Sequence, residues 1–140
     1  MLAATDKLPR ATIIWAGRNN ATDPATVESD IADMVAALGH QRYLVLSLLN
    51  GSDDPAGDPI YEDIAEINAA LATTYGAHFV DVRSYLVSLY DPNIPQDVTD
   101  HENDVPPSSL RTDSLHLNSA GYAAVAGKIF GSIGILEAGL

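Results

Sequence analysis

The sequence predicts one α/β domain over residues 1–140, with a parallel sheet that carries helices on both faces. Three mainly apolar runs of strand length, at residues 12–16, 43–49 and 78–82, predict buried strands. A segment with helical character follows each run, and strands that alternate with helices form βαβ crossovers. A chain of 140 residues is within the usual range for one domain and can bury a core.

The first strand is preceded by a connector and followed by a loop and a helix. Residues 1–10 are short and polar, and we expect the tail of a helix and a connector there. After the strand, residues 17–22 form a loop. Asp23-Pro24 then predicts a helix start, because Asp is a favoured N-cap and Pro a favoured first residue. Gly39 is placed to end this helix. Its apolar positions are Val27, Ile31, Met34, Val35 and Leu38.

The second strand leads into a loop and a longer helix. The loop, residues 50–58, is rich in Gly, Pro and Asp. Asp58-Pro59 repeats the helix-start signal, and Gly76 is placed as the stop. The apolar face of this helix is expected to hold Ile60, Ile64, Ile67 and Leu71.

A short helix at residues 83–90 is expected after the third strand. Residues 91–112 contain four prolines and predict a long loop, and loops of that length in a compact domain are more often functional than incidental. The last helix is expected to begin at Asn118 or Ser119, both N-cap types, and to run to about Ile133.

Composition excludes several partners. Seven basic and nineteen acidic residues give a formal charge of −12, which argues against binding to nucleic acid or an anionic membrane surface. The chain has no cysteine, so disulfides and thiolate metal sites are excluded and the compartment stays open. No apolar run reaches the roughly 18 residues of a membrane span. The N-terminus lacks the regions of a signal peptide, so a soluble protein is expected.

Asp113 and His116 lie three residues apart, just before the last helix. A histidine that takes a proton from a nucleophile needs a carboxylate to fix its tautomer and to stabilise the imidazolium. An Asp three residues upstream in a tight loop can do this locally. Taken alone, however, this spacing favours a turn acid and a surface histidine.

A second stretch, residues 11–20, favours the catalytic interpretation. It is an apolar, β-branched run that ends in Gly, Arg and two Asn, so a buried strand delivers Gly17 and Asn19 to the loop at its carboxyl end. Ligands of open α/β sheets bind at that edge. A Gly N–H and an Asn amide are suitable donors for a developing oxyanion.

Together the two stretches resemble the SGNH (GDSL-like) hydrolase superfamily of esterases, lipases and carbohydrate deacetylases. Gly17-Arg18-Asn19-Asn20 is similar to its Gly-x-Asn-Asp block, with Asn20 in place of Asp, and Asp113-Ser114-Leu115-His116 to its Asp-x-x-His block. The resemblance implies a three-layer α/β/α, flavodoxin-like fold of which this chain covers the later part. It also implies His116 as base, Asp113 as its orienting acid, and Gly17 and Asn19 as oxyanion donors.

The family's nucleophile block, Gly-Asp-Ser after its first strand, and its second glycine block do not occur here. Two strands therefore have no counterpart in this chain, and His116 has no evident serine to activate. Ser47 lies toward the end of the second strand and Ser52 in the loop that follows, which is the ligand-facing side. They are therefore the first candidates for the nucleophile. For each, a capping or solvated hydroxyl is the favoured interpretation.

The missing strands would leave residues 12–15 as an apolar edge, which soluble proteins avoid. We therefore expect a homo-oligomer or association with a chain that supplies the missing strands.

Other polar groups have weaker interpretations. Arg18 is suited to attract an anionic substrate group, with a solvated arginine as the favoured interpretation. An acidic cluster in the long loop is suited to a hard cation such as calcium, with a solvated loop as the favoured interpretation because the spacing does not match an EF-hand. This cluster consists of Asp97, Asp100, His101, Glu102 and Asp104.

The sequence thus predicts an SGNH-type serine ester hydrolase without a metal or cofactor, acting on a small-molecule or carbohydrate ester. The first alternative is a non-catalytic SGNH-like fragment or oligomeric binding module that lacks the nucleophile. A flavodoxin-like domain for a small anion is disfavoured, because no Gly-rich phosphate loop is present.

Overall fold

The computed structural model describes residues 11–138, and the connector expected at residues 1–10 lies outside the described residues. Three short parallel strands form the sheet, in the order β1 (Thr12–Ile14), β2 (Tyr43–Leu46) and β3 (Phe79–Val80). The parallel sheet is confirmed. Each strand is shorter than its apolar run, which extended to residues 16, 49 and 82.

Beyond the ends of β1 and β2, side chains form hydrogen bonds with backbone groups that strand pairing would otherwise satisfy. The indole Nε1 of Trp15 donates to the carbonyl of Ser47 at 3.1 Å. The Asn68 amide accepts from the N–H of Leu48 at 2.7 Å and donates to its carbonyl at 3.0 Å. These bonds satisfy backbone groups just beyond β2, so the chain needs no further ladder there.

Both helix starts predicted from Asp-Pro pairs are confirmed. The helices are α1 (Pro24–Ala36) and α2 (Pro59–Tyr75). Asp23 accepts a hydrogen bond from a backbone N–H in the first turn of α1 at 3.2 Å, and Asp58 does the same for α2 at 2.8 Å. The carboxylates thus satisfy N–H groups that have no partner within the helix.

The remaining predicted helices are also present, with shifted ends. The short helix is α3 (Val82–Ser88) rather than 83–90, and the last helix, α5 (Ser119–Ala138), continues past Ile133. Asn118 caps α5 by accepting from the first-turn N–H groups at 2.9 and 3.0 Å, as its N-cap type predicted.

The prediction of an irregular loop over residues 91–112 is wrong. This segment contains α4 (Pro95–Glu102) and a 3₁₀ turn, η3 (Ser108–Leu110). The buried positions of α4 are Asp97 and Asp100, one turn apart, so the inward face of the helix is carboxylate rather than apolar. A search for apolar residues at helical spacing therefore misses it.

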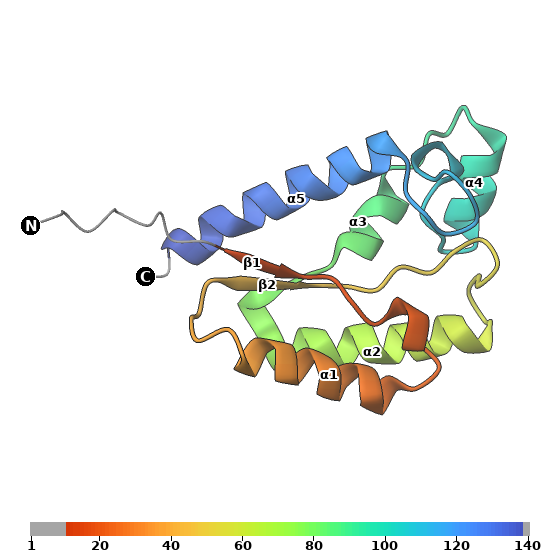
Figure 1. Ribbon diagram of the computed structural model, residues 1–140. Coiled ribbons are helices and arrows are strands. Elements are labelled where there is room, and N and C mark those ends of the chain that lie inside the picture. The colour runs from red at the N-terminus through yellow and green to blue at the C-terminus, as the bar shows by residue number, and fades with distance from the viewer. Residues whose placement is uncertain (1–10, 139–140) are drawn as a thin grey trace, which may run out of the picture.

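The helices cover both faces of the sheet, as predicted (Figure 1). α1 and α2 pack against one face, where the core contains Val27, Ile31, Val45, Ile64 and Leu71. α3 and α5 pack against the other face, where the core contains Leu44, Leu46, Val82, Leu86 and Val125. Two more 3₁₀ turns, η1 (Arg18–Asn20) and η2 (Gly76–His78), follow β1 and precede β3. None of the described helices has both the length and the apolar character that a bilayer crossing requires.

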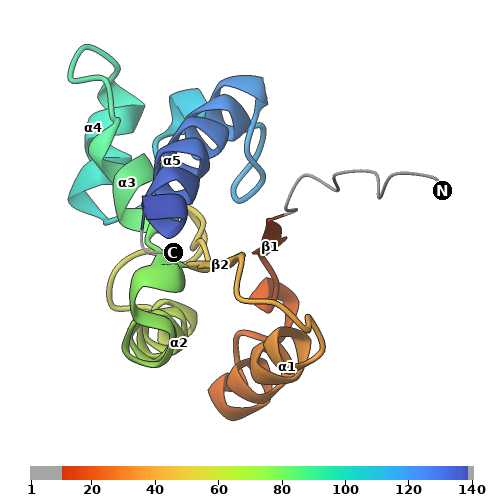
Figure 2. The same cartoon turned by 90° about the vertical axis from the view of Figure 1, so that its left-hand side faces the viewer.

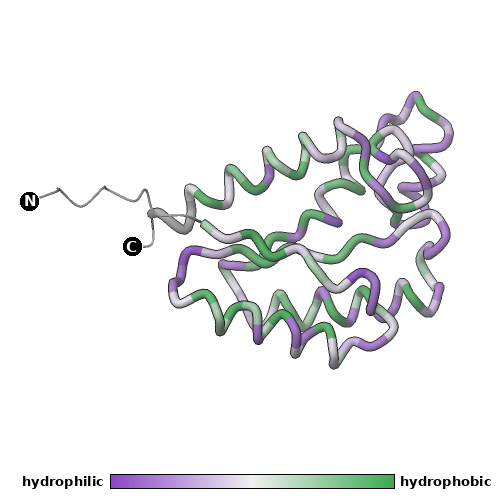
Figure 3. The backbone as a smooth tube through the Cα atoms, viewed as in Figure 1, coloured by the Kyte–Doolittle hydropathy of each residue, from purple (hydrophilic) through white to green (hydrophobic). Residues whose placement is uncertain are grey.

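β1 forms one edge of the sheet, between α1 and α5 (Figure 2). Among the described strands only β2 pairs with it. Ile13 and Trp15 on this edge are 38% and 37% exposed. From residue 119 to 134, α5 has a single charged side chain, Lys128, and Figure 3 shows it as mostly apolar or neutral. Its Phe130 is 82% exposed. Within the described chain, apolar side chains are therefore exposed at the edge of β1 and on α5.

Candidate active site

Asp113 and His116 form a hydrogen-bonded pair in the loop before α5. One carboxylate oxygen of Asp113 accepts from the backbone N–H groups of Leu115 at 2.9 Å and His116 at 2.7 Å. The other oxygen lies 2.8 Å from Nδ1 of His116. These bonds, led by the one from the His116 backbone, lower the pKa of Asp113 from 3.8 to about 2. The carboxylate is therefore ionised at neutral pH. The structure places Asp113 and His116 in contact, as their spacing in the sequence predicted.

The contact at Nδ1 leaves the other ring nitrogen of His116 for proton transfer. A carboxylate at Nδ1 favours the neutral tautomer with its proton on that nitrogen, so the lone pair lies on Nε2. Within residues 11–138, Nε2 has no hydrogen-bond partner. The side chain is 73% exposed. The ring is thus arranged as a general base for a group that reaches it.

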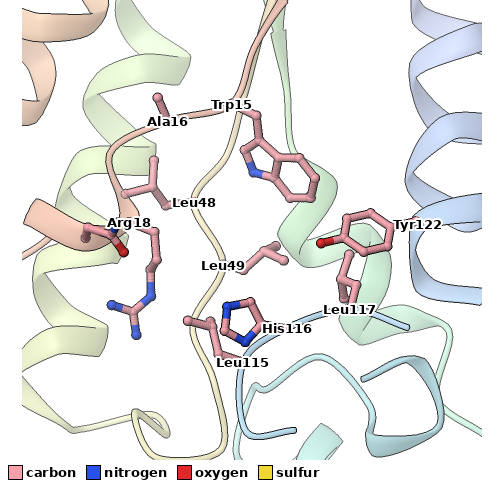
Figure 4. A pocket seen from close by; sticks show the side chains of 10 residues that line it. Trp15, Ala16, Arg18, Leu48, Leu49, Leu115, His116, Leu117 and Tyr122 are labelled. Carbon is pink, nitrogen blue, oxygen red and sulfur yellow. The ribbon is translucent and has the colours of Figure 1, made fainter. Parts of the chain in front are cut away.

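His116 lines a cavity of about 310 Å³ at the carboxyl ends of β1 and β2. Figure 4 shows Trp15 from the segment after β1, His116 and Leu115 from the Asp113 loop, and Tyr122 from α5 around this space. The cavity is lined by Trp15, Ala16, Arg18, Asn19, Leu48, Leu49, Leu115, His116, Leu117 and Tyr122. It has the apolar walls and few polar groups of a small-ligand site.

The loop after β1 contributes the predicted oxyanion donors in different ways. Asn19 lies in η1 and lines the His116 cavity, and no hydrogen bond within the described residues engages its side-chain amide. Gly17 lines an adjoining cavity of about 410 Å³ beside α1, which also contains Asn19. Gly17 has φ +105°, a conformation that a residue with a side chain rarely adopts. The structure thus places Asn19, but not Gly17, in the wall of the His116 cavity.

Arg18 has a partner within the protein. Its guanidinium forms an ion pair with Asp54, whose side chain is 10% exposed. Asp54 also accepts from the N–H of Gly51 at 3.4 Å. The ion pair therefore ties the loop after β1 to the loop after β2, which makes it a structural link instead of the solvated arginine favoured from sequence.

No serine or threonine within residues 11–138 lines the His116 cavity. Ser47 is completely buried, and its hydroxyl donates to Asp81 at 3.2 Å and accepts from the backbone N–H of Arg83 at 2.9 Å. Ser52 is exposed, and its hydroxyl lies 3.4 Å from the guanidinium of Arg111. The arrangement of Ser47 is that of a structural hydroxyl, and neither serine faces His116 across the cavity.

The three aspartates of the acidic cluster have separate partners. Asp97 accepts from Ser108 and Ser109, Asp100 pairs with Arg111 at 2.7 Å, and Asp104 pairs with Arg83 at 2.6 Å. In the described part of the chain, no group of three or more acidic or histidine side chains is placed to hold a metal ion. The cluster stabilises the structure from residue 95 to 111.

Two residues that support the site were not singled out from sequence. A Cβ at Gly51 would run into the carbonyl of Ser114, so only glycine fits where the loop after β2 meets the Asp113 loop. Arg111 donates to the carbonyl of Asp113 at 2.8 Å. For Arg111 the available signal was its place two residues before Asp113, whereas the contact of Gly51 with Ser114 joins two loops whose meeting depends on the fold.

The chain is similar to part of a phage protein. It is 31% identical over 109 residues to the tail spike protein of Salmonella phage epsilon15, a match that covers 74% of this chain and 10% of that protein. The chain therefore spans about a tenth of the length of this relative. No protein family model and no solved structure matches the chain.

Proposed function

We propose that this chain is an SGNH-type ester hydrolase module in which His116 is the general base and Asp113 orients it. One observation carries the proposal: Nε2 of the oriented histidine and the unengaged amide of Asn19 belong to the same small cavity. A base and an oxyanion donor around one cavity are what acyl transfer requires besides a nucleophile. The substrate class is a small-molecule or carbohydrate ester.

The proposed reaction proceeds through an acyl-enzyme. A serine hydroxyl attacks the ester carbonyl carbon while Nε2 of His116 takes its proton, and the carbonyl electrons move onto the oxygen. The Asn19 amide stabilises that oxyanion. The bond to the alcohol oxygen then breaks, and the alcohol leaves with the proton from His116. Water attacks the acyl-serine by the same route, which releases the acid and restores the serine.

The strand order supports the family resemblance. A flavodoxin-like sheet has the order 2-1-3-4-5, so its last three strands are neighbours in sequence order. The order β1-β2-β3 fits those three strands. The cavity also lies at the carboxyl ends of the strands, where such folds bind their ligands.

In this proposal the nucleophile is a serine of a second copy of this chain, a segment of which pairs with the open edge of β1. In the 2-1-3-4-5 order, the third strand pairs with the first, and the resemblance puts the serine directly after that first strand. A parallel strand beside β1 would end at the edge of the sheet where His116 lies. It would also cover Ile13 and Trp15 and lower the exposure of the Asp113–His116 pair, which strengthens the pair's electrostatics.

The alternative function is a non-catalytic binding or assembly module. Two observations favour it: no hydroxyl of the described serines and threonines lines the His116 cavity, and the relative is a phage tail spike protein, of which the matched part is a tenth. In this alternative, the apolar side at β1 and α5 is an interface between copies, and the cavity does not turn over a substrate.

A fluorophosphonate serine probe combined with a chromogenic short-chain ester assay separates the two functions. The hydrolase predicts one stoichiometric adduct and ester turnover, both lost in His116→Ala. His40→Ala is the matched control, because His40 is also exposed but lies away from the cavity and hydrogen-bonds Thr12 instead. Absence of both signals in folded protein would reject the hydrolase for this chain and favour the module.

Light scattering tests the association. We expect the chain to be oligomeric at micromolar concentration, and Ile13→Lys to shift it toward monomer by placing a charge on the open edge. Leu89→Lys is the matched control, since Leu89 is 39% exposed against 38% for Ile13 but follows α3. A monomer that neither substitution changes would count against self-association.

A further inference from the structure

Arg111 is a buried arginine at the base of the Asp113 loop. Its side chain is 5% exposed, and it does not line the His116 cavity. Its guanidinium donates to the carbonyls of Pro106 and Asp113, each at 2.8 Å. It also donates to the Asp100 carboxylate at 2.7 Å. An arginine with this number of fixed partners holds the segments it joins in one geometry.

Asp100 holds the guanidinium in place from α4. Its side chain is 4% exposed, and its second oxygen accepts from the Gln96 amide at 2.9 Å. The backbone of Arg111 also forms a bridge with Leu117, and the N–H of Thr112 donates to the carbonyl of His116 at 2.7 Å. The Asp113 loop is therefore closed at its base by backbone bonds and fixed from below by a buried ion pair.

We propose that Arg111, held by Asp100, is a positioning residue that keeps Asp113 aligned on Nδ1 of His116. This inference rests on the proposed function. Arg111 contacts the carbonyl of Asp113 and not its carboxylate, so it fixes the main chain from which the carboxylate extends. When that bond is lost, the main chain at Asp113 keeps only the bonds of its own loop and is held less firmly. The carboxylate then moves away from Nδ1.

The consequence is a change in the histidine tautomer. A carboxylate at Nδ1 keeps the proton there and leaves Nε2 as the base. A loosened carboxylate allows the other tautomer, in which Nε2 carries the proton and cannot accept one. Arg111 thus acts on proton transfer through Asp113, without touching the substrate.

The test uses variants that keep the protein folded. Arg111→Met alone leaves the Asp100 carboxylate buried without a partner, which is strongly destabilising. The double variant Arg111→Met/Asp100→Leu removes both charges, and replacing a buried ion pair by apolar side chains is often neutral. Arg83→Met/Asp104→Asn is the control, because Arg83 donates to both the carbonyl and the carboxylate of Asp104 and the two side chains are 11% and 40% exposed. Asn is used at position 104 because Asp104 has φ +55°, which Asn tolerates better than Leu.

The readouts are the tautomer of the neutral His116 ring by ¹⁵N NMR and the kinetics of ester turnover. We expect Arg111→Met/Asp100→Leu to lower the fraction with the proton on Nδ1 at least about twofold, and to lower kcat about tenfold with KM unchanged. The control pair should leave both within about twofold, and Arg111→Lys should restore part of the Nδ1 fraction. A folded double variant with the wild-type tautomer overturns the inference. The tautomer is measured without substrate. Absence of turnover in the wild type would therefore reject the proposed function, while the tautomer of the double variant would still test the positioning role of Arg111.

Discussion

Alanine at position 17 tests how the loop after β1 is held. Gly17 has φ +105°, which costs a residue with a Cβ about 1–2 kcal/mol. The new Cβ would lie 2.5 Å from Cγ1 of Val27. Val27 is 1% exposed and β-branched, so its methyl group cannot swing aside, and such overpacking costs a further amount of about 1–3 kcal/mol. We therefore expect Gly17→Ala to lower the free energy of unfolding by about 2–5 kcal/mol.

Urea unfolding followed by the fluorescence of Trp15, the single tryptophan, measures this cost. Gly57→Ala is the control for the backbone term, since Gly57 has φ +92° and a Cβ at that position would meet no heavy atom within 4 Å, so it should cost only about 1–2 kcal/mol. Adding Val27→Ala to Gly17→Ala should give a double variant that is more stable than the sum of the two costs implies. Equal destabilisation by Gly17→Ala and Gly57→Ala would refute the close packing of this loop on α1.

Three further predictions concern single polar groups. Ser47→Ala should cost about 1–3 kcal/mol, because it leaves the backbone N–H of Arg83 without a partner and removes one of the two donors to the Asp81 carboxylate. Any His116-dependent turnover should stay unchanged; loss of turnover in a folded variant would instead make Ser47 the nucleophile. Burial raises the pKa of Asp97, but hydrogen bonds from serine and backbone donors outweigh this effect, so the net pKa is lowered. The ionised Asp97 carboxylate therefore stabilises the fold above about pH 4, and this contribution is lost as the pH falls through the lower pKa of the folded state. Urea midpoints between acid and neutral pH should therefore fall less steeply in Asp97→Asn, and an unchanged slope would contradict this. The carboxyl carbon of Asp113 should titrate by NMR near pH 2, so that its bond to His116 persists above about pH 4, and a midpoint at the ordinary 3.8 would mean that the loop bonds do not form.

Helix starts and the sheet were predictable from sequence because short-range rules decide them. Asp23, Asp58 and Asn118 each cap the helix that follows, and an N-cap acts within three residues of its position. The alternation of strands and helices was enough to predict parallel pairing. The ends of the strands were less predictable, because the Asn68 amide bonds the backbone of Leu48 from another element.

α4 was missed because its buried face is polar. Asp97 and Asp100 are buried with hydrogen-bonding partners further along the chain, in η3 and at Arg111. Pattern rules assume that buried positions are apolar, so two carboxylates one turn apart indicated a solvated loop. Pro95 at the first helical position was the one local signal of a helix start.

Some residues of the candidate site were likewise predictable from sequence, and others were not. Asp113 and His116 are three residues apart, so their contact was predictable from spacing. Asn19 could be placed at the same edge of the sheet because parallel strands share their carboxyl ends. Gly51 and Arg18 could not be assigned their roles, because the contact of Gly51 with Ser114 and that of Arg18 with Asp54 depend on how loops meet in three dimensions.

The protonation of the His116 ring tests the central claim most directly. At alkaline pH, where a histidine ring is neutral, ¹⁵N NMR of the wild type should show the proton on Nδ1 and a bare Nε2, and Asp113→Asn should abolish that preference. This result would establish a histidine oriented by Asp113 as a base toward the cavity. A wild-type ring with its proton on Nε2, or one that Asp113→Asn leaves unchanged, would contradict the account.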